Sequence, residues 1–217
     1  CLGGAAILLA LGIWQMQRLA WKEGVLRDIN ARIVANPVPL PDALDPMTDA
    51  FLPVATEGQF VGDSLRVLVS QKDIGAGYRL ITGFDTGGSR ILGDRGFILT
   101  DAPSFPVPQG PLAIVGNLQW PDETDGFTPA PDLDNNIWFA RDVTAMADAL
   151  DTDRVLLVVR EMSPSEATVT PLPVDTSRIP NNHLQYAITW FSLAAIWLAM
   201  SVLFLRRRRS AHTESKT

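Results

Sequence analysis

The sequence contains few of the side chains from which most active sites are built. It has one cysteine, Cys1, and two histidines, His183 and His212, among 217 residues. A single thiol excludes an intramolecular disulfide and a cysteine-based metal cluster. His212 lies in a polar tail and His183 at the start of an apolar run, so neither is well placed to activate a nucleophile. Because the sequence starts on Cys1 rather than Met, we expect its natural start to be missing.

Glycine spacing and charge argue against two further classes of protein. No glycine run has the spacing of a phosphate loop or a dinucleotide fingerprint. Residues 30–180 contain 10 Lys/Arg and 21 Asp/Glu, a balance of −11, and such an acidic segment is not expected to bind nucleic acid. Acidic runs such as "PDETD" (121–125) leave a paired-acid hydrolase open, although a solvated loop is the simpler interpretation. We therefore expect neither an enzyme nor a nucleic-acid-binding protein.

Two apolar segments lie at the ends of this chain. Residues 187–205 contain no charge and are followed by four arginines, 206–209. As a helix they would be roughly 28 Å long, which matches the apolar thickness of a bilayer. The N-terminal segment is apolar only as far as Trp14 and lacks a signal-peptide cleavage pattern. We interpret residues 1–21 as a first transmembrane helix.

The sequence predicts a membrane protein in which two transmembrane α-helices flank a mainly antiparallel, barrel-like α+β domain. Its expected parts are a first span (1–21), a connector helix and proline-rich linker (22–53), a β-rich domain (54–178), a second span (183–205) and a basic tail (206–217). Short alternating or β-branched runs predict strands at 54–60, 65–70, 78–84, 90–99, 112–120, 137–140 and 154–161. Asp142 is expected to cap a helix over 142–150.

The distribution of charge predicts the orientation. The arginines 206–209 should stay on the cytoplasmic side, and the acidic middle should be translocated, although Arg18, Lys22 and Arg27 argue the other way. We expect the inner (plasma) membrane of a bacterium with the main domain in the periplasm. The mitochondrial inner membrane is less favoured, because no long N-terminal extension is present.

The stretch "RIPNNHLQYAITWF" (178–191) contains the candidate ligand. The asparagines can cap a helix and place His183 in its first turn, where the helix dipole disfavours protonation. Tyr186, Ala187 and Trp190 share its helical face. A neutral imidazole beside an apolar, indole-lined slot suits an axial ligand of haem iron. The alternative is an interfacial histidine that hydrogen-bonds a lipid headgroup or the neighbouring helix.

Several motifs together resemble the surfeit-locus (Shy1-type) family of cytochrome c oxidase assembly factors. They are "LGIWQMQRLAWKEGVL" (11–26), "FLPVATEGQF" (51–60), "GYRLITGF" (77–84), "ILGDRGFI" (91–98), "GNLQW…FTP…NNIWFARDVTAMA" (116–147) and "PNNHLQYAITWFSLA" (180–194). The family's usual N-R-G-W is "GDRGF" here, which leaves Arg95 a structural or partner role. The resemblance covers the whole chain.

The resemblance implies a protein that assists insertion of haem a into the largest oxidase subunit. The histidine of the N-N-H motif, His183, would be the axial ligand of the haem iron, with Trp190 and Tyr186 on its helical face. Trp14 and Arg18 would be neighbours from the first helix; Arg18 would either pair with a haem propionate or extend to the membrane interface. Implied partners are the largest oxidase subunit, other assembly factors, the haem a synthesis enzyme and the lipid bilayer. The alternative function is a scaffold that holds an unfinished oxidase subunit without ligating haem.

Overall fold

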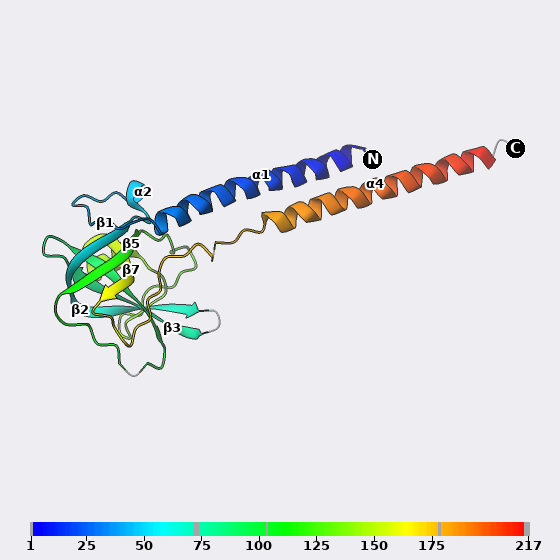
Figure 1. Cartoon of the computed structure of the whole chain (residues 1–217). Coiled ribbons are helices and arrows are strands. Elements are labelled where there is room, and N and C mark those ends of the chain that lie inside the picture. Colours follow the sequence, from blue (N-terminus) through cyan, green and yellow to red (C-terminus); the bar gives the residue numbers. More distant parts are fainter. Residues whose placement is uncertain (1, 72–73, 103, 178, 215–217) are drawn as a thin grey trace. The chain divides into compact units, whose positions relative to one another are not determined.

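The computed structural model describes residues 2–71, 74–102, 104–177 and 179–214, and the chain divides into two compact units (Figure 1). One unit is the central segment Ile29–Asp175, and the other combines Cys1–Asp28 with Thr176–Thr217. Cys1 and the last three residues of the predicted basic tail lie outside the described residues.

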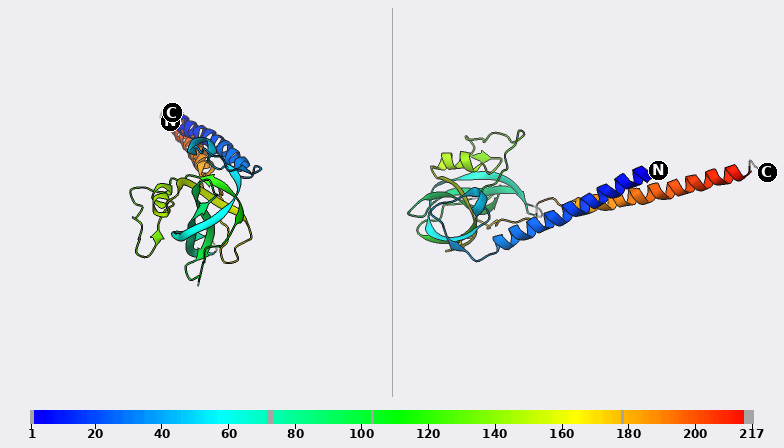
Figure 2. Two further views of the ribbon diagram at one scale, coloured as in Figure 1. Left: turned by 90° about the vertical axis from the view of Figure 1, so that its left-hand side faces the viewer. Right: turned by 90° about the horizontal axis from the view of Figure 1, so that it is seen from above.

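Strands dominate the central unit (Figure 2). They are β1 (Val38–Pro39), β2 (Pro53–Gln71), β3 (Gly75–Asp85), β4 (Arg90–Leu99), β5 (Leu112–Gln119), β6 (Ile137–Trp138) and β7 (Asp153–Ser163). Helix α2 (Pro46–Asp49) precedes β2, and helix α3 (Val143–Leu150) lies between β6 and β7. The side chain of Asp142 accepts a hydrogen bond from the backbone N–H of Ala145, which confirms the predicted cap of α3.

The predicted strands correspond to the observed ones with one instructive difference. The runs 54–60 and 65–70 belong to a single strand, β2, whose register against β3 shifts between Val61 and Ser64. Gly62 lies in this irregular stretch with a φ of 74°, a conformation that glycine adopts without strain. The separate elements β1 and α2 form within residues 36–53, where the sequence predicts only an extended connector.

The sheet has the order β1-β2-β3-β4-β7-β5, and β6 pairs with β2. Four ladders are antiparallel, whereas β1–β2, β2–β6 and β4–β7 are parallel. The first part of β2 also pairs with β5, so the path β2-β3-β4-β7-β5 leads back to β2. The sheet is nevertheless mixed and is not a clear barrel, because the β4–β7 ladder has only four residue pairs and a register shift.

Strand β7 shows how the core is built on both faces of the sheet. Val155, Leu157 and Val159 enter one apolar cluster with Phe60 and Phe84 from β2 and β3. The alternate residues Leu156 and Val158 enter a second cluster, in which Met146 and other side chains of α3 cover the sheet. A strand that is buried on both faces requires the continuous apolar sequence "VLLVV" rather than alternation.

Helices α1 (Leu2–Ile33) and α4 (His183–Glu214) are the long helices of the chain. Within the described residues, only His183–Arg207, with 25 residues and a mean hydropathy of 2.1, has the length and composition to cross a membrane. The first span, predicted for residues 1–21, is not shown, because Gln15, Gln17 and Arg18 interrupt the apolar run of α1 after Trp14.

Candidate functional site

The candidate ligand His183 is the first residue of α4, as the sequence predicts. The carbonyl of Asn182 accepts a hydrogen bond of 3.1 Å from the N–H of Tyr186, which closes the first turn. The imidazole of His183 is half-buried, and its Nδ1 lies 2.7 Å from Oε1 of Gln15 on α1. In the structure, His183 is therefore hydrogen-bonded to the neighbouring helix, as the alternative interpretation expects. This contact involves Nδ1 and does not involve Nε2.

The contact with Gln15 determines which nitrogen of His183 is available to a ligand. An amide oxygen only accepts hydrogen bonds, so Nδ1 donates in this contact, and in the neutral imidazole Nε2 then holds the lone pair. Within the part of the chain that the structure describes, Nε2 has no hydrogen-bond partner. This is the tautomer that an axial ligand to iron requires, with a second residue orienting the ring. We call this histidine and its partner glutamine the His183 site.

Helices α1 and α4 run antiparallel along a shared seam that contains the His183 site. On α1 the seam residues are Ala5, Leu8, Gly12, Gln15, Leu19 and Lys22; on α4 they are His183, Ala187, Trp190, Ala194, Trp197 and Ser201. Both sets repeat at alternating intervals of three and four, the pattern of two helices that interdigitate along their length.

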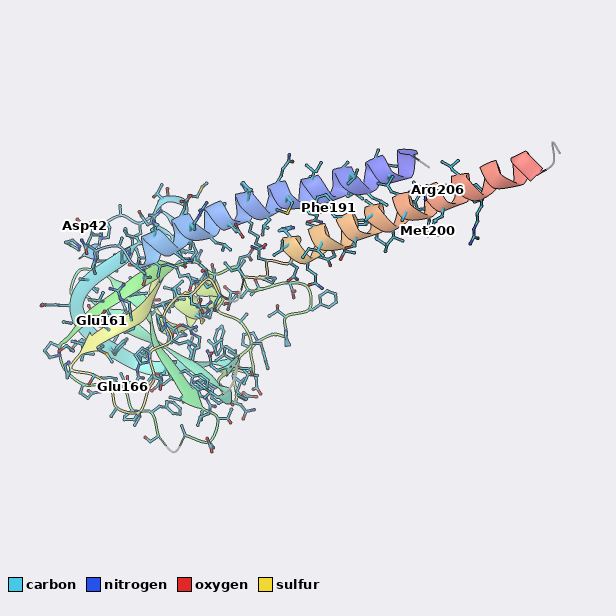
Figure 3. All side chains as sticks on the ribbon, turned by 45° about the vertical axis from the view of Figure 1, so that its right-hand side comes forward. Asp42, Glu161, Glu166, Phe191, Met200 and Arg206 are labelled. Atoms are coloured by element: carbon cyan, nitrogen blue, oxygen red, sulfur yellow. The ribbon has the colours of Figure 1, made fainter. Side chains whose placement is uncertain are left out.

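Small residues on α1 lie opposite large rings on α4. A Cβ atom added at Gly12 would meet the ring of Phe191, which lies beside α1 in Figure 3, and one added at Gly4 would meet the indole of Trp197. This close approach brings the two backbones near enough for Gln15 to reach His183.

The other predicted site residues of α4 occupy different surroundings. Trp190 is half-buried on the seam, about 10.5 Å along the helix axis from His183 at 1.5 Å per residue. Tyr186 lies one turn from His183, but it is 54% exposed on the flank of the helix. Trp190 thus shares the seam with the candidate ligand, and Tyr186 lies outside it.

The predicted neighbours from α1 lie beside the seam rather than on it. Trp14 is 50% exposed, and Arg18 is also exposed, with its guanidinium over the ring of Trp21 at 4.5 Å from the centroid. At the same depth, the buried residue is Gln15, and Lys22 on the same face donates a hydrogen bond to the carbonyl of Pro180. The structure thus places Trp14 and Arg18 on the exposed face of this turn of α1, and the three-four repeat through Gly12 and Gln15 marks the buried face.

The donor set of the His183 site fits a haem rather than a bare metal ion. Among the described residues, no group of three or more His, Cys, Asp or Glu gathers to hold an ion. A single imidazole would suit an iron whose equatorial ligands come from a porphyrin. Close in sequence, the side-chain oxygen of Asn181 is buried and has no hydrogen-bond partner in the described structure. Such an atom costs about 1–3 kcal/mol unless a bound group or water satisfies it.

In the central unit, Arg95 has a structural role. Its guanidinium is fully buried and pairs with the carboxylate of Glu166: Nε donates to Oε2 at 3.1 Å, and Nη2 donates to Oε1. Nη1 also donates to the hydroxyl of Ser64 at 2.9 Å, and Nη2 to the carbonyl of Pro106 at 2.6 Å. The departure from the family motif around Arg95 therefore lies in the interior of the domain.

Arg95 and Arg79 together fix the segment that follows β7, residues 164–175, which we call the strap. Arg79 donates to the carbonyl of Leu172 at 2.6 Å and pairs with Asp94 at the same distance. Desolvation raises the pKa of the buried Asp94 carboxyl, and the charge of Arg79 opposes that shift. The backbones of Phe97 and Thr170 exchange two hydrogen bonds, so the strap continues the sheet locally.

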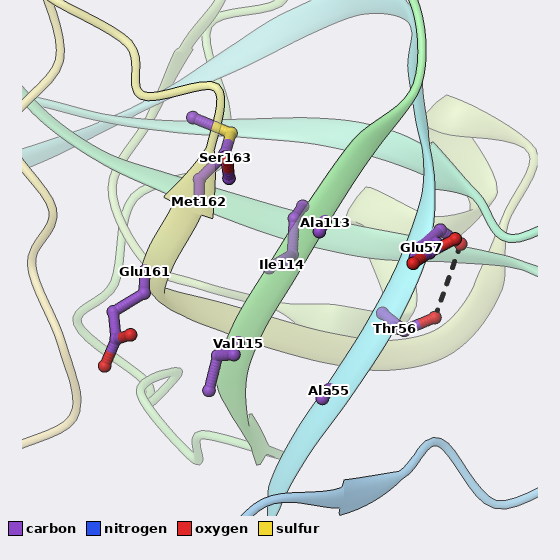
Figure 4. A pocket seen from close by; sticks show the side chains of 9 residues that line it. All are labelled: Ala55, Thr56, Glu57, Ala113, Ile114, Val115, Glu161, Met162 and Ser163. Carbon is purple, nitrogen blue, oxygen red and sulfur yellow. Dashed lines mark hydrogen bonds between the residues drawn. The ribbon is translucent and has the colours of Figure 1, made fainter.

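The central unit also has an open groove across β2, β5 and β7, with a volume of about 460 Å³ (Figure 4). Its lining includes the carboxylates of Glu57 and Glu161 and the apolar side chains of Val115 and Met162. Glu161 pairs with Arg160 at 3.2 Å. The hydroxyls of Thr56 and Ser163 also line this groove, and that of Thr56 donates to the backbone carbonyl of Glu57 at 3.5 Å.

These features define a class of protein: a sheet-rich α+β domain inserted between two helices, one of them apolar enough to cross a membrane, with a single histidine held at the seam of the helices. The chain belongs to the SURF1 family, whose sequence model matches residues 2–195. The resemblance drawn from the motifs is thereby confirmed.

The curated relatives come from bacteria and animals. The chain is 29% identical to the SURF1-like protein of Rickettsia conorii over 93% of this chain and 88% of that one. It is 27% identical to Surfeit locus protein 1 of Rattus norvegicus, over 93% and 72% of the two chains. The SURF1-like protein of Drosophila melanogaster is 28% identical over 93% and 74%.

Proposed function

We propose that this protein assists the assembly of a haem–copper cytochrome c oxidase by holding haem a at the membrane interface for insertion into the largest oxidase subunit. It acts in this proposal as a binding protein and not as an enzyme. Family membership and the motif resemblance support the assembly role. The observation that carries the haem role is the 2.7 Å contact between His183 and Gln15, since it engages Nδ1 and leaves Nε2 available.

Haem a is the cargo in this proposal, and the residues of the His183 site bind and orient it. Nε2 of His183 supplies the axial bond, and Trp190, two turns along the seam, offers an apolar ring surface to the macrocycle. Tyr186, Trp14 and Arg18, which are exposed on either side of the seam, would contact the edges of the haem. One weak axial bond would suit a cargo that must be released.

The membrane arrangement is part of the proposal. Large apolar side chains of α4 face outward, among them Ile188 at 59% and Leu203 at 58% exposure, and Ile7 and Ile13 of α1 do the same at 63% and 54%. We propose that α1 crosses the bilayer beside α4, which covers these side chains with lipid. The acidic domain then lies in the periplasm of a bacterium and the arginines 206–209 in the cytoplasm.

The proposed partners follow from this position. The largest oxidase subunit receives the haem, the haem a synthesis enzyme supplies it in the same bilayer, and other assembly factors meet the domain. A partner surface for each of them is expected on the periplasmic side or within the membrane.

The test is the visible absorption spectrum of the detergent-purified full chain, co-expressed with the haem a synthesis enzymes. Wild-type protein should show a haem a Soret and alpha band, which His183→Ala abolishes. His212→Ala, which removes the only other histidine, should leave the bands unchanged. Haem retained by His183→Ala would place the ligand elsewhere. No haem in wild type, with oxidase assembly still dependent on the protein, would establish the scaffold instead.

A further inference from the structure

Gln15 has a property that its position in an apolar helix does not explain. It is 9% exposed and lies on the seam of α1, so its amide is largely removed from solvent. A buried amide without a partner is costly, and the partner that the structure gives it is His183, 168 residues away in the sequence. Gln17, two residues further, is exposed. The two glutamines of this motif therefore have different surroundings: Gln15 lies in the seam, where its amide contacts His183, and Gln17 faces outward.

The geometry points to Gln15 as the positioning residue of the candidate ligand; this inference rests on the proposed haem function. We propose that its amide oxygen holds His183 in the Nδ1–H tautomer and fixes the plane of the ring, so that Nε2 faces the haem-binding side. A free imidazole exchanges between two tautomers and rotates about χ2, and only one combination presents a lone pair in the required direction. Partners of this kind are worth 10–100-fold in the affinity of a histidine for its metal.

Three features of the contact support a positioning role. The distance of 2.7 Å is that of a well-formed hydrogen bond. The acceptor is neutral, so it orients the ring without attracting a second proton to it, as a carboxylate would. The small residues Gly12 and Ala5 on the same face keep α1 close to α4, which maintains the register of the contact.

The experiment compares Gln15→Leu, which removes the acceptor at similar volume, with Gln15→Glu, which retains an acceptor, and with Gln17→Leu as the matched control. The first readout is the ¹⁵N NMR spectrum of histidine-labelled full chain in nanodiscs without haem. Wild type and Gln17→Leu should show one Nδ1–H signal pattern for His183, and Gln15→Leu should show averaging between tautomers. A fixed Nδ1–H pattern in Gln15→Leu would overturn the proposal.

The second readout is a titration of the same proteins with ferric protohaem followed at the Soret band. We expect Gln15→Leu to weaken binding 10–100-fold, and Gln15→Glu, which keeps an acceptor but attracts a second proton, to weaken it less. Unchanged affinity in Gln15→Leu would overturn the positioning role. If wild type binds no haem at all, the proposed function fails, while the NMR result still decides whether Gln15 sets the tautomer. Thermal unfolding of each variant separates this role from a purely structural one, in which stability changes but the tautomer does not.

Discussion

Removal of the carboxylate of Glu166 should destabilise the central domain far more than removal of an exposed one. The side chain of Glu166 is 8% exposed and that of its partner Arg95 is 0% exposed. In Glu166→Ala the guanidinium loses its counter-charge and two of its four hydrogen bonds, while the bonds to Ser64 and Pro106 remain. A buried charge that loses its partner costs about 3–5 kcal/mol.

The chain supplies its own control for this prediction. Glu161 pairs with Arg160 at 3.2 Å, but its side chain is 69% exposed. Exposed pairs contribute between about 0 and 1 kcal/mol, so Glu161→Ala should be nearly neutral. The two variants differ in burial and not in the chemistry of the deleted group.

The assay is denaturant unfolding of the full chain in detergent, followed by the fluorescence of the tryptophans, of which Trp138 is buried in the domain core. A loss below about 1 kcal/mol for Glu166→Ala, or equal losses for Glu166→Ala and Glu161→Ala, would refute the reasoning. A double variant, Arg95→Met with Glu166→Leu, should recover much of the loss, because apolar side chains of similar volume leave no charge unpaired.

Two further predictions concern the same domain. Burial opposes ionisation of Glu123, but hydrogen bonds and charge from Arg141 outweigh it and hold the pKa of that carboxyl below its ordinary value of 4.5. Its stabilisation is therefore present above pH 4.5 and is lost as the pH falls, so Glu123→Gln should show a shallower acid limb in a plot of unfolding free energy against pH; an unchanged limb would contradict this. Gly96 has a φ of 126°, and an added Cβ would collide with the carbonyl of Thr170 in the strap. Gly96→Ala should cost more than about 2 kcal/mol in thermal unfolding, whereas Gly88→Ala, which has open space, should cost little, and equal melting temperatures would contradict the strap contact.

Local patterns predicted the elements of the domain well. The apolar runs of β3 to β7 and the cap of α3 at Asp142 depend on neighbours in sequence, and they lie where the pattern places them. The continuity of β2 was missed because the polar residues 62–64 read as a turn, whereas β3 pairs with both sides of the irregular stretch. The parallel β4–β7 ladder joins segments about sixty residues apart, and no local pattern encodes such a pairing.

The sequence predicted the position of His183 but not its hydrogen-bond partner, because that partner is also far away in the sequence. The position of His183 in the first turn of α4 follows from the asparagines and the apolar run. Its hydrogen-bond partner depends on the register between two helices, and the sequence named only Trp14 and Arg18, as neighbours of a bound haem. Packing of Gly12 against Phe191 determines that register, and it selects Gln15.

The 168 residues between Gln15 and His183 also have a consequence for the order in which the protein is made. At typical rates of synthesis of about 5–20 residues per second, α1 emerges roughly 10–30 seconds before the start of α4. During that interval the whole β domain is translated and can fold, while the side chain of Gln15 still lacks its hydrogen-bond partner His183. In the proposed function the nitrogen of His183 is therefore presented only after the start of α4 has been made, so a chain that ends before residue 183 would carry the β domain without the proposed binding site.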